Sequence, residues 1–191
     1  MNVVFVTGNR HKFHEALHIL SEYGIHLHQD TKGYIEIQSD SIEEIVLFGI
    51  KEVMKRVRDK SAYIIEDAGL FIEALDGFPG PYSSYVCRTI GNRGILKLME
   101  GVKNRKAKFV SCVGFCSEDL GPMLFKGEVY GSISKFERGS HGFGFDPIFE
   151  FDSTGKTFGE MTPDEKSVCS HRFIALKKFA NFFMEYEKER A

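Results

Sequence analysis

An apolar segment interrupted by two acids is the feature of this sequence that most restricts its fold. Residues 62–65 are an apolar run that leads directly into Glu66 and Asp67, and the chain becomes apolar again at residues 70–72. A short apolar run of this kind predicts a buried strand. A carboxylate inside a core is costly unless a cation or a hydrogen-bond network meets it. We therefore expect this strand to end at a cleft where both acids can be satisfied.

The composition is that of an ordinary globular protein. The chain has 191 residues, of which 42% are hydrophobic and 27% charged, and we expect one folded domain over residues 1–191. The 25 Lys and Arg residues against 27 Asp and Glu residues give a formal net charge of -2. No overall basic field exists to hold nucleic acid or an anionic membrane. An anionic ligand must therefore be bound by a local cluster.

Hydropathy and cysteine content favour a cytoplasmic protein. No apolar run approaches the roughly 20 residues that span a bilayer, and the start of the sequence lacks the basic and then apolar segments of a secretion signal. The four cysteines form no CxxC pair, which favours buried thiols over a zinc site or a redox centre. We expect neither a membrane nor a nucleic acid as partner.

Apolar periodicity predicts strands and helices in turn along the chain. Strands are expected at residues 2–6, 34–38 and 62–65 and as a hairpin of residues 106–116 and 123–133. Helices are expected around Phe13, Ala16, Leu17 and Leu20, after a capping box of Ser41 and Glu44, at residues 83–89 and 95–100, from Thr162, and after Arg172. The core-facing stripes are Val46, Ile50, Val53 and Val57 in the second helix and Leu176, Phe179, Ala180 and Phe183 in the last.

The turn between the first strand and the first helix is a candidate anion site. A helix N-terminus presents unbonded N–H groups and a partial positive charge, and both attract phosphate. Gly8 lets an anion approach the backbone, Thr7 and Asn9 offer hydrogen bonds, and Lys12 adds a full charge. The turn matches neither the Walker nor the dinucleotide motif. The alternative is a plain capped helix.

Glu66, Asp67 and Glu36 are candidate metal ligands. Mg²⁺ is a hard ion that takes oxygen ligands and commonly shares them with substrate phosphates. Glu36 is one of the few charges in the predicted strand 34–38. The alternative for Glu66 and Asp67 is a salt bridge or a polar strand edge, and the alternative for Glu36 is an ordinary exposed strand position.

A glycine-rich loop at residues 139–147 carries aromatic and polar groups together. His141, Phe143 and Phe145 are suited to stack on a ring, and Asp146 is suited to accept hydrogen bonds from the edge of that ring. The alternative is a core loop whose aromatic side chains point inward.

A second polar cluster lies at residues 166–172, near a predicted helix boundary. It combines two fixed cations, a titratable ring and a hydroxyl, in Lys166, Arg172, His171 and Ser170. A solvated helical face is the alternative. Together with the turn, the carboxylates and the aromatic loop, this cluster indicates one ligand that satisfies all of them, a nucleotide with Mg²⁺.

These motifs resemble, in order and spacing, those of the inosine/xanthosine triphosphate pyrophosphatases, and the archaeal members most closely. The matching residues extend across nearly the whole chain. They are Thr7-Gly8-Asn9-Arg10-His11-Lys12, Glu36, Lys51, Glu66-Asp67-Ala68-Gly69-Leu70, Gly77-Phe78-Pro79-Gly80-Pro81-Tyr82, Phe143-Gly144-Phe145-Asp146, Lys166 and Ser170-His171-Arg172. The resemblance implies an α/β fold with a long twisted mixed β-sheet flanked by helices, in two lobes with a central cleft. It also implies a homodimer.

The resemblance further implies an activity and the residues that carry it. The enzyme would hydrolyse ITP, dITP and XTP to the nucleoside monophosphate and pyrophosphate with Mg²⁺, removing deaminated purines from the nucleotide pool. Glu36 and Asp67 would bind the metal, and Asp67 would also activate water, either as a base or through the metal. The triphosphate would be held by Thr7, Gly8, Asn9, Arg10, His11 and Lys12, with Lys51 and Lys166 neutralising its charge.

Base recognition is implied for the remaining residues. Phe145 would stack on the base, while Asp146, His171 and Arg172 would recognise a purine with an oxygen at position 6. A site built to pair with one edge pattern leaves its own groups unsatisfied when another base enters. The same implied substrate-binding set includes Ala68, Phe143, Gly144 and Ser170.

Two positions depart from the family and keep alternatives open. Ala68 stands where the family commonly has Ser or Thr, and Ser84 stands where it often has Lys or Arg. The backbone N–H of Ala68 and the side chain of Arg88 are candidate substitutes. The alternatives are a house-cleaning pyrophosphatase for modified pyrimidine triphosphates, a nucleotide-binding regulator with little turnover, and an RNA-binding module. Base selectivity, turnover and salt-dependent RNA affinity distinguish them.

Overall fold

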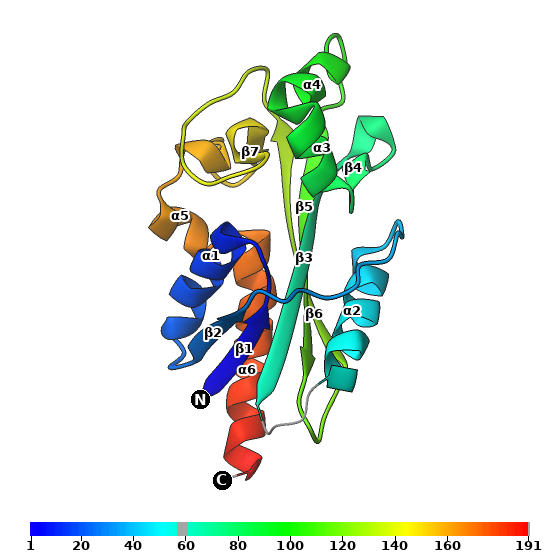
Figure 1. Ribbon diagram of the computed structural model, residues 1–191. Coiled ribbons are helices and arrows are strands. Elements are labelled where there is room, and N and C mark those ends of the chain that lie inside the picture. Colours follow the sequence, from blue (N-terminus) through cyan, green and yellow to red (C-terminus); the bar gives the residue numbers. More distant parts are fainter. Residues whose placement is uncertain (57–60, 191) are drawn as a thin grey trace. The chain divides into compact units, whose positions relative to one another are not determined.

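A computed structural model of the protein describes residues 1–56 and 61–190 (Figure 1). The strands are β1 (Asn2–Val6), β2 (His26–Asp30), β3 (Ala62–Ile72), β4 (Pro79–Gly80), β5 (Lys106–Cys116), β6 (Met123–Ile133) and β7 (Phe149–Phe151). The helices are α1 (Arg10–Ser21), α2 (Ile42–Arg56), α3 (Ser83–Thr89), α4 (Gly91–Leu98), α5 (Pro163–Ser167) and α6 (His171–Arg190). Short 3-10 helices cover Glu73–Leu75, Asp146–Ile148 and Phe158–Glu160.

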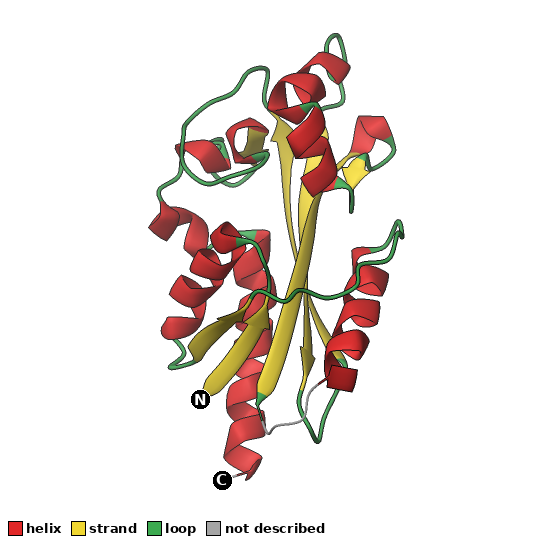
Figure 2. Cartoon of the chain, viewed as in Figure 1, coloured by secondary structure: helices red, strands yellow, loops and turns green. Residues whose placement is uncertain are grey.

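The strands form one mixed sheet, and helices flank it (Figure 2). The order is β2-β1-β3-β5-β6-β7, and β4 pairs with β3. β1 is parallel to β2 and to β3, whereas β4 is antiparallel to β3 and β7 is antiparallel to β6. The mixed α/β fold that the resemblance implied is therefore confirmed.

The chain divides into two compact units. Unit 1 comprises Met1–Asp67, Ser111–Gly127 and Arg172–Ala191, and unit 2 comprises Ala68–Val110 and Glu128–His171. The chain passes from one unit to the other between Asp67 and Ala68 and between His171 and Arg172. Residues that the sequence places side by side thus belong to different units.

In unit 1, helices pack on both faces of the sheet. Val113 and Phe115 of β5 join a core to which α1 contributes Leu20 and α6 contributes Phe179. Gly114 lies between them, and a Cβ there would be 2.7 Å from Cγ1 of Val46 in α2. Since successive strand residues point to opposite faces, α2 covers the face opposite α1 and α6.

In unit 2, aromatic rings form much of the core beside β6 and β7. The ring centroids of Phe109 and Phe149 are 4.7 Å apart, and those of Phe149 and Phe158 are 5.1 Å apart. A Cβ on Gly131 of β6 would lie 2.2 Å from the carbonyl oxygen of Glu150 in β7. The close pairing of β6 with β7 therefore requires glycine at residue 131.

Most predicted elements are confirmed. The strands 2–6, 106–116 and 123–133 and the helix 83–89 have the predicted bounds, and α5 begins at the capping box of Thr162 and Glu165. The predicted stripe of α6 is buried, as are Val46, Ile50 and Val53 of α2. Val57 lies outside the described residues.

Three local predictions need correction. In α1, Leu17 is 37% exposed and Ile19 is buried in its place. The strand predicted at residues 62–65 continues through both acids to Ile72. The capping box of α2 forms only on one side: the Ser41 hydroxyl accepts a hydrogen bond from the Glu44 N–H at 3.3 Å, but the Glu44 carboxylate accepts from the Ser39 hydroxyl at 2.7 Å.

The predicted strand at residues 34–38 is wrong. Residues 33–39 are neither helix nor strand, and the strand in this part of the chain is β2, at His26–Asp30. β2 is an edge strand that buries only Leu27 fully. A strand with so little buried surface gives no apolar run in the sequence, so its pattern was missed.

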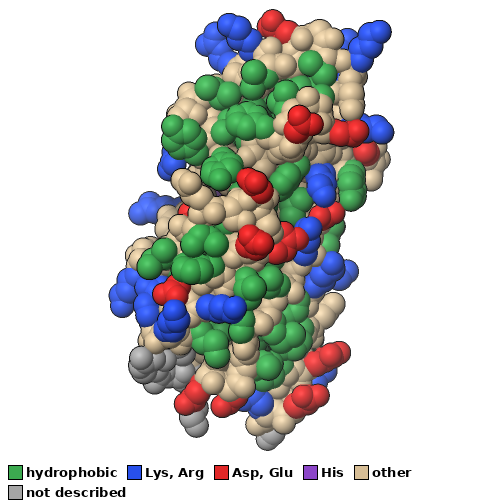
Figure 3. All heavy atoms as spheres, turned by 90° about the vertical axis from the view of Figure 1, so that its right-hand side faces the viewer, with side chains coloured by type: hydrophobic (Ala, Val, Ile, Leu, Met, Phe, Trp, Pro, Cys, Tyr) green, Lys and Arg blue, Asp and Glu red, His purple; other side chains and the backbone are tan. Residues whose placement is uncertain are grey.

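The expectation of buried thiols holds only in part, because Cys112 and Cys116 are buried whereas Cys87 and Cys169 are half-buried. All four cysteines are free thiols, and burial raises the pKa of Cys112 to about 12 and that of Cys116 to about 11. Among the helices of residues 1–56 and 61–190, none has the length and hydropathy that a membrane-spanning helix requires. Figure 3 shows acidic and basic side chains interspersed over one face.

Candidate active site

The predicted site residues fall into two groups, one in each unit. Within unit 1, the turn before α1, the middle of β3 and the start of α6 contribute charged side chains. Within unit 2, the loop at residues 139–147 and α5 contribute a second set. Each group is described within its own unit.

The turn before α1 is organised by its own side chains. Asn9 is the N-cap, and its Oδ1 accepts hydrogen bonds from the N–H groups of His11 (2.9 Å) and Lys12 (3.2 Å). The Thr7 hydroxyl accepts from the Asn9 N–H at 3.1 Å. A Cβ on Gly8 would meet no atom within 4 Å. The hydrogen bonds are those of a capped helix, and the space beside Gly8 is open.

Lys12 lies against the two acids of β3. Its Nζ is 3.1 Å from Oε2 of Glu66 and 3.3 Å from Oδ1 of Asp67, and it donates a hydrogen bond to the Glu66 carbonyl oxygen at 3.1 Å. Glu66 is 3% exposed, whereas Asp67 is half-buried. The salt-bridge alternative therefore holds for both acids, and Asp67 is the one of the two that solvent reaches.

Arg172 completes this buried cluster from the start of α6. Its guanidinium is 3.2 Å from Oε1 of Glu66 and also pairs with Glu15 of α1. The Ser111 hydroxyl donates to Oε1 of Glu66 at 2.6 Å. Arg172 is 2% exposed, so in this structure it connects α6 with α1 and β3. Its implied contact with a base stays a prediction.

The charges of this cluster stabilise one another. Burial by itself raises the pKa of Glu66, but the charges of Arg172 and Lys12 and the bond from Ser111 outweigh it and lower the pKa to about 2. Burial lowers the pKa of Lys12, but the carboxylates of Glu66 and Asp67 outweigh it and raise the pKa above 10.5. Glu66 is thus ionised and Lys12 protonated at neutral pH.

Glu36 is an exposed residue that lies near the same acids. Burial raises the pKa of Tyr34 well above 10, and the charges of Asp67, Glu36 and Glu66 raise it further. The charges of Glu36 and Asp67 thus both act on the Tyr34 hydroxyl within unit 1.

This donor set fits a magnesium ion. Mg²⁺ in nucleotide enzymes is usually bound by one or two carboxylates together with substrate phosphates and water, and Glu36 and Asp67 supply two carboxylates. Among residues 1–56 and 61–190, no group of three or more His, Cys, Asp or Glu side chains is arranged to hold a metal ion. A metal here would therefore depend on oxygen ligands from the substrate.

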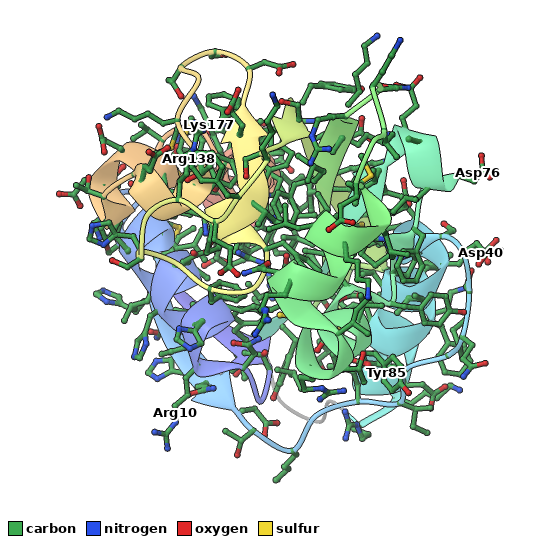
Figure 4. All side chains as sticks on the ribbon, turned by 90° about the horizontal axis from the view of Figure 1, so that it is seen from above. Arg10, Asp40, Asp76, Tyr85, Arg138 and Lys177 are labelled. Atoms are coloured by element: carbon green, nitrogen blue, oxygen red, sulfur yellow. The ribbon has the colours of Figure 1, made fainter. Side chains whose placement is uncertain are left out.

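The remaining predicted phosphate ligands of unit 1 lie at its surface. Lys51 is an exposed residue of α2, outside the buried stripe of that helix. Arg10 and His11 are exposed at the start of α1, and the side chain of Arg10 extends outward (Figure 4).

In unit 2, Asp146 and Lys166 form a buried pair. Nζ of Lys166 is 2.7 Å from Oδ2 of Asp146, and the same oxygen accepts a hydrogen bond from the Phe143 N–H at 2.7 Å. Lys166 is 5% exposed, and its ammonium lies 5.2 Å from the ring centroid of Phe143. A Cβ on Gly142 would be 2.0 Å from Oδ2 of Asp146. The loop is thus closed around the Asp146 carboxylate.

The two aromatic residues of the loop differ in exposure. Phe145 is 3% exposed, as the inward-pointing alternative predicted, while Phe143 and Gly144 are half-buried. Of the two phenylalanines, Phe143 therefore has the ring that solvent reaches in this structure. The implied stacking of Phe145 on a base stays a prediction.

His171 and Ser170 lie inside unit 2. The His171 ring stacks on Phe109, with centroids 4.6 Å apart and planes inclined by 10°. Lys166, Ser170, His171 and Arg172 are all buried. The alternative of a solvated helical face is wrong for this cluster.

The two departures from the family are partly exposed. Ala68 is half-buried in β3 and Ser84 is exposed in α3. Arg88 lies four residues after Ser84 in the same helix, so both are on one face of α3. The charges of Arg88 and Asp146 both influence the pKa of Cys87, which burial raises. One turn of α3 thus separates Arg88 from Ser84, as is needed if Arg88 is to replace the cation that the family often has at position 84.

Three residues of the clusters were not predicted from the sequence. They are Glu15, Ser111 and Tyr34. Glu15 is separated from Arg172 by 157 positions and Ser111 from Glu66 by 45. The only signal in the sequence was that a buried Glu66 needs cationic or hydrogen-bonding partners. That signal does not tell which residues of the chain these partners are.

The fold and the carboxylate–lysine cluster define an α/β protein with a polar site on its sheet, and comparison with known proteins gives its family. The Ham1 family model matches residues 3–182. A dITP/XTP pyrophosphatase of Methanopyrus kandleri is 50% identical over 183 residues, 96% of both chains. A second, from Methanothermobacter marburgensis, is 50% identical over 185 residues, 97% of both. The structure of the Staphylococcus aureus Ham1 protein is similar with a TM-score of 0.83 and 25% identity, covering 97% of this chain and 100% of that one. The chain belongs to the Ham1 family.

Proposed function

We propose that the protein is a nucleoside triphosphate pyrophosphatase for non-standard purines. It hydrolyses ITP, dITP and XTP to the nucleoside monophosphate and pyrophosphate with Mg²⁺ and so removes them from the nucleotide pool. The observation that carries this proposal is the near full-length similarity to relatives named dITP/XTP pyrophosphatase, at 50% identity. The cluster of Lys12, Glu66 and Asp67 supports it with suitable chemistry.

In unit 1, the chain's own groups bind phosphate and activate water. Lys12 stays cationic because Glu66 and Asp67 hold its ammonium, and it neutralises phosphate charge. The open side of Gly8 lets phosphate oxygens approach the N-terminus of α1. Asp67 accepts the proton of the attacking water, and Arg10, His11 and Lys51 add surface hydrogen bonds and charge.

Glu36 and Asp67 are the residues that hold the metal. Mg²⁺ bound there supplies positive charge that stabilises the negative charge of the reacting phosphate oxygens. Glu66 does not need to bind the metal, because Lys12, Ser111 and Arg172 already meet its carboxylate.

In unit 2, Asp146 and the ring of Phe143 recognise the base. A purine with an oxygen at position 6, guanine included, carries a proton on N1, which a carboxylate can accept as a hydrogen bond, so this contact selects against adenine and not against guanine. Adenine presents a lone pair at N1, and a carboxylate facing it would lose its donor. Lys166 and the Phe143 N–H hold the Asp146 carboxylate in one orientation, so that it can distinguish a protonated N1 from an unprotonated one. The stacking of Phe145 on the base and a contact of His171 with it, which the resemblance implies, belong to the same proposal, although both side chains are buried in this structure.

Product analysis with a nucleotide panel tests the proposal. We expect pyrophosphate release from ITP, XTP and dITP with Mg²⁺, far less from ATP, GTP and dTTP, and almost none without metal. Equal turnover of ATP would contradict the purine selectivity, and orthophosphate as the direct product would contradict the cleavage position. A preference for modified pyrimidine triphosphates would favour the related house-cleaning activity. Tight binding of ITP without turnover would indicate a nucleotide-binding regulator.

The remaining expectations concern the assembly and location of the protein. We infer that residues 1–191 act as one functional domain, because the chain alternates between the two units and each unit is built from separate segments of the sequence. We also infer a homodimer in the cytoplasm, where nucleotide pools are maintained. Sedimentation velocity tests the dimer, since a monomer at micromolar concentration would contradict it.

A further inference from the structure

Histidines gather on the exposed face of α1. Five of the seven histidines of the chain lie in α1 and β2, and three of these are in α1. The three are His11, His14 and His18, and each is exposed. Residues three and four apart in a helix are neighbours on its surface, so the three imidazoles share one face. Ala16 and Leu20 of the same helix are buried in the core of unit 1, and the histidine face is therefore the one that solvent reaches.

His14 and His18 have the spacing at which a helix presents two side chains to one metal ion. Residues at i and i+4 have Cβ atoms about 5–6 Å apart. Imidazole nitrogens bind Zn²⁺ at about 2.0–2.1 Å, so two of them on one ion are at most about 4 Å from each other. Imidazoles on successive turns of α1 can span that separation by rotation about their side-chain bonds.

Residues 14–18 also match the H-E-x-x-H motif of zinc hydrolases. In those enzymes the two histidines bind the ion and the glutamate is the general base. In this chain the carboxylate of Glu15 pairs with the guanidinium of Arg172, which is 2% exposed. Glu15 is thus held towards the core of unit 1 and away from the histidine face. The motif therefore supplies two metal ligands without a base, which supports metal binding and not hydrolysis at this place.

The rotation of α1 about its axis is fixed, so both histidines stay on the outer face. Asn9 caps the start of the helix through the N–H groups of His11 and Lys12. The ion pair of Glu15 with Arg172 and the burial of Leu20 hold the opposite side. An ion bound by His14 and His18 would have to order only their two side chains, which keeps the entropic cost of binding small.

The ligand chemistry selects the class of ion. In the described part of the chain, no group of three or more His, Cys, Asp or Glu side chains is arranged to hold a metal ion, so water would complete the coordination of an ion at this histidine pair. Imidazole suits Zn²⁺ and Ni²⁺, whereas Mg²⁺ prefers oxygen ligands. The ion therefore differs in class from the Mg²⁺ proposed for Glu36 and Asp67.

His26 and His28 are the competing histidine pair. Both are exposed, and they lie two residues apart on one face of β2. Two residues of a strand span about 7 Å, which is more than the 5–6 Å between Cβ atoms four apart in a helix. The pair in α1 therefore fits a single ion better.

We propose that His14 and His18 form a binding site for a divalent transition-metal ion, Zn²⁺ or Ni²⁺, on the exposed face of α1. The ion joins two successive turns of the helix. Because it binds the folded helix, it stabilises the folded protein as its concentration rises. The site is independent of the proposed pyrophosphatase function, since it shares no residue with the proposed Mg²⁺ site.

Calorimetric titration of the whole protein with Ni²⁺ tests the proposal. Mg²⁺ is kept in excess, so that the carboxylates proposed to bind it are occupied. We expect His14→Gln and His18→Gln each to raise the Ni²⁺ concentration for half-saturation at least about tenfold, since losing even a group that only orients a ligand costs about 10–100-fold. Ni²⁺ should also raise the melting temperature of the parent but not that of the variant with both substitutions.

His28→Gln is the matched control. It removes one exposed imidazole from β2 by the same substitution and should bind Ni²⁺ like the parent. Pyrophosphate release from ITP with Mg²⁺ should stay within about twofold of the parent value in His14→Gln and His18→Gln. A larger loss would overturn the independence of the two sites.

Three results would overturn the histidine pair itself. Equal Ni²⁺ affinity of the parent and the double variant would place the ion elsewhere. Weakened binding in only one of the single variants would indicate a lone imidazole ligand. Weakened binding in His28→Gln, with normal binding in both α1 variants, would assign the ion to the pair in β2.

Discussion

Burial separates the charged residues of unit 1 into those that meet a ligand and those that support them. Glu66 and Arg172 are buried, and their charges are met by Lys12, Glu15 and Ser111 inside the protein. Asp67 follows Glu66 directly, shares the ammonium of Lys12 with it and is half-buried. One strand thus supplies a fully buried carboxylate and a neighbouring one that solvent reaches.

Replacing Asp67 tests the reactive role. Asp67→Asn keeps the size of the side chain and removes its ability to accept a proton, so turnover of ITP should fall at least about a hundredfold. Pyrophosphate release at saturating Mg²⁺ measures it. Asp40→Asn is a control of the same chemistry at an exposed position (Figure 4) and should keep parent activity. An Asp67→Asn enzyme as active as the parent would remove Asp67 from its proposed role.

At the scale of elements, glycines allow α2 to lie close to the sheet. Gly114 of β5 faces Val46 and Ile50, and Gly49 of α2 faces Ile65 and Tyr34. Both glycines are placed where helix and sheet would otherwise be held apart. The position of α2 in turn fixes the ends of the segment that carries Glu36.

Filling the space at Gly114 should destabilise this packing. In Gly114→Ala the new Cβ would lie 2.7 Å from Val46 Cγ1 and 3.2 Å from Ile50 Cβ. Overpacking of this kind costs about 1–3 kcal/mol, which exceeds the 0.4–1 kcal/mol that a Gly→Ala change gains through the unfolded chain. Urea unfolding measures the difference. Gly8→Ala, whose Cβ would meet nothing within 4 Å, should instead raise the free energy of unfolding by about 0.4–1 kcal/mol.

At the scale of the whole molecule, the buried charges make stability depend on pH. Lys12, Glu15, Glu66 and Arg172 join α1, β3 and α6 in unit 1 and balance one another in sign. The folded protein lowers the pKa of Glu66 from 4.5 to about 2, so the unfolded chain binds this proton more readily. The stabilisation from Glu66 is therefore complete above pH 4.5 and is lost as the pH falls towards 2.

Acid unfolding of Glu66→Gln tests this linkage. The parent protein should lose about 3 kcal/mol more than the variant between pH 5 and pH 2, since a pKa difference of one unit corresponds to about 1.4 kcal/mol. At pH 7 the variant should be less stable by about 3 kcal/mol, because Arg172 loses a buried anion. Urea midpoints at a series of pH values measure both effects. Parallel pH curves for the two proteins would show that Glu66 does not carry the acid sensitivity.

The predictions that succeeded at each scale relied on local patterns. The alternation of apolar residues located β1, β5 and β6 because these strands bury one or both faces, and the 3.6-residue period located α6. β2 was missed because an edge strand with one fully buried side chain carries no such pattern. The motifs of the turn and of the acids in β3 were recognisable because their residues are adjacent in the chain.

The sequence by itself determined that the adjacent acids Glu66 and Asp67 need a cation or a hydrogen-bond network, that a helix N-terminus follows β1, and that the chain resembles the family to which it belongs. Only the tertiary structure decided that Lys12 and Arg172 are those cations and that the ring of Tyr34 packs against Gly49 of α2. The physical reason is the separation in sequence over which each kind of interaction acts. Burial periodicity and capping act between residues a few positions apart. Ion pairs and the packing of a ring against a helix glycine join residues that only the folded sheet and helices bring together.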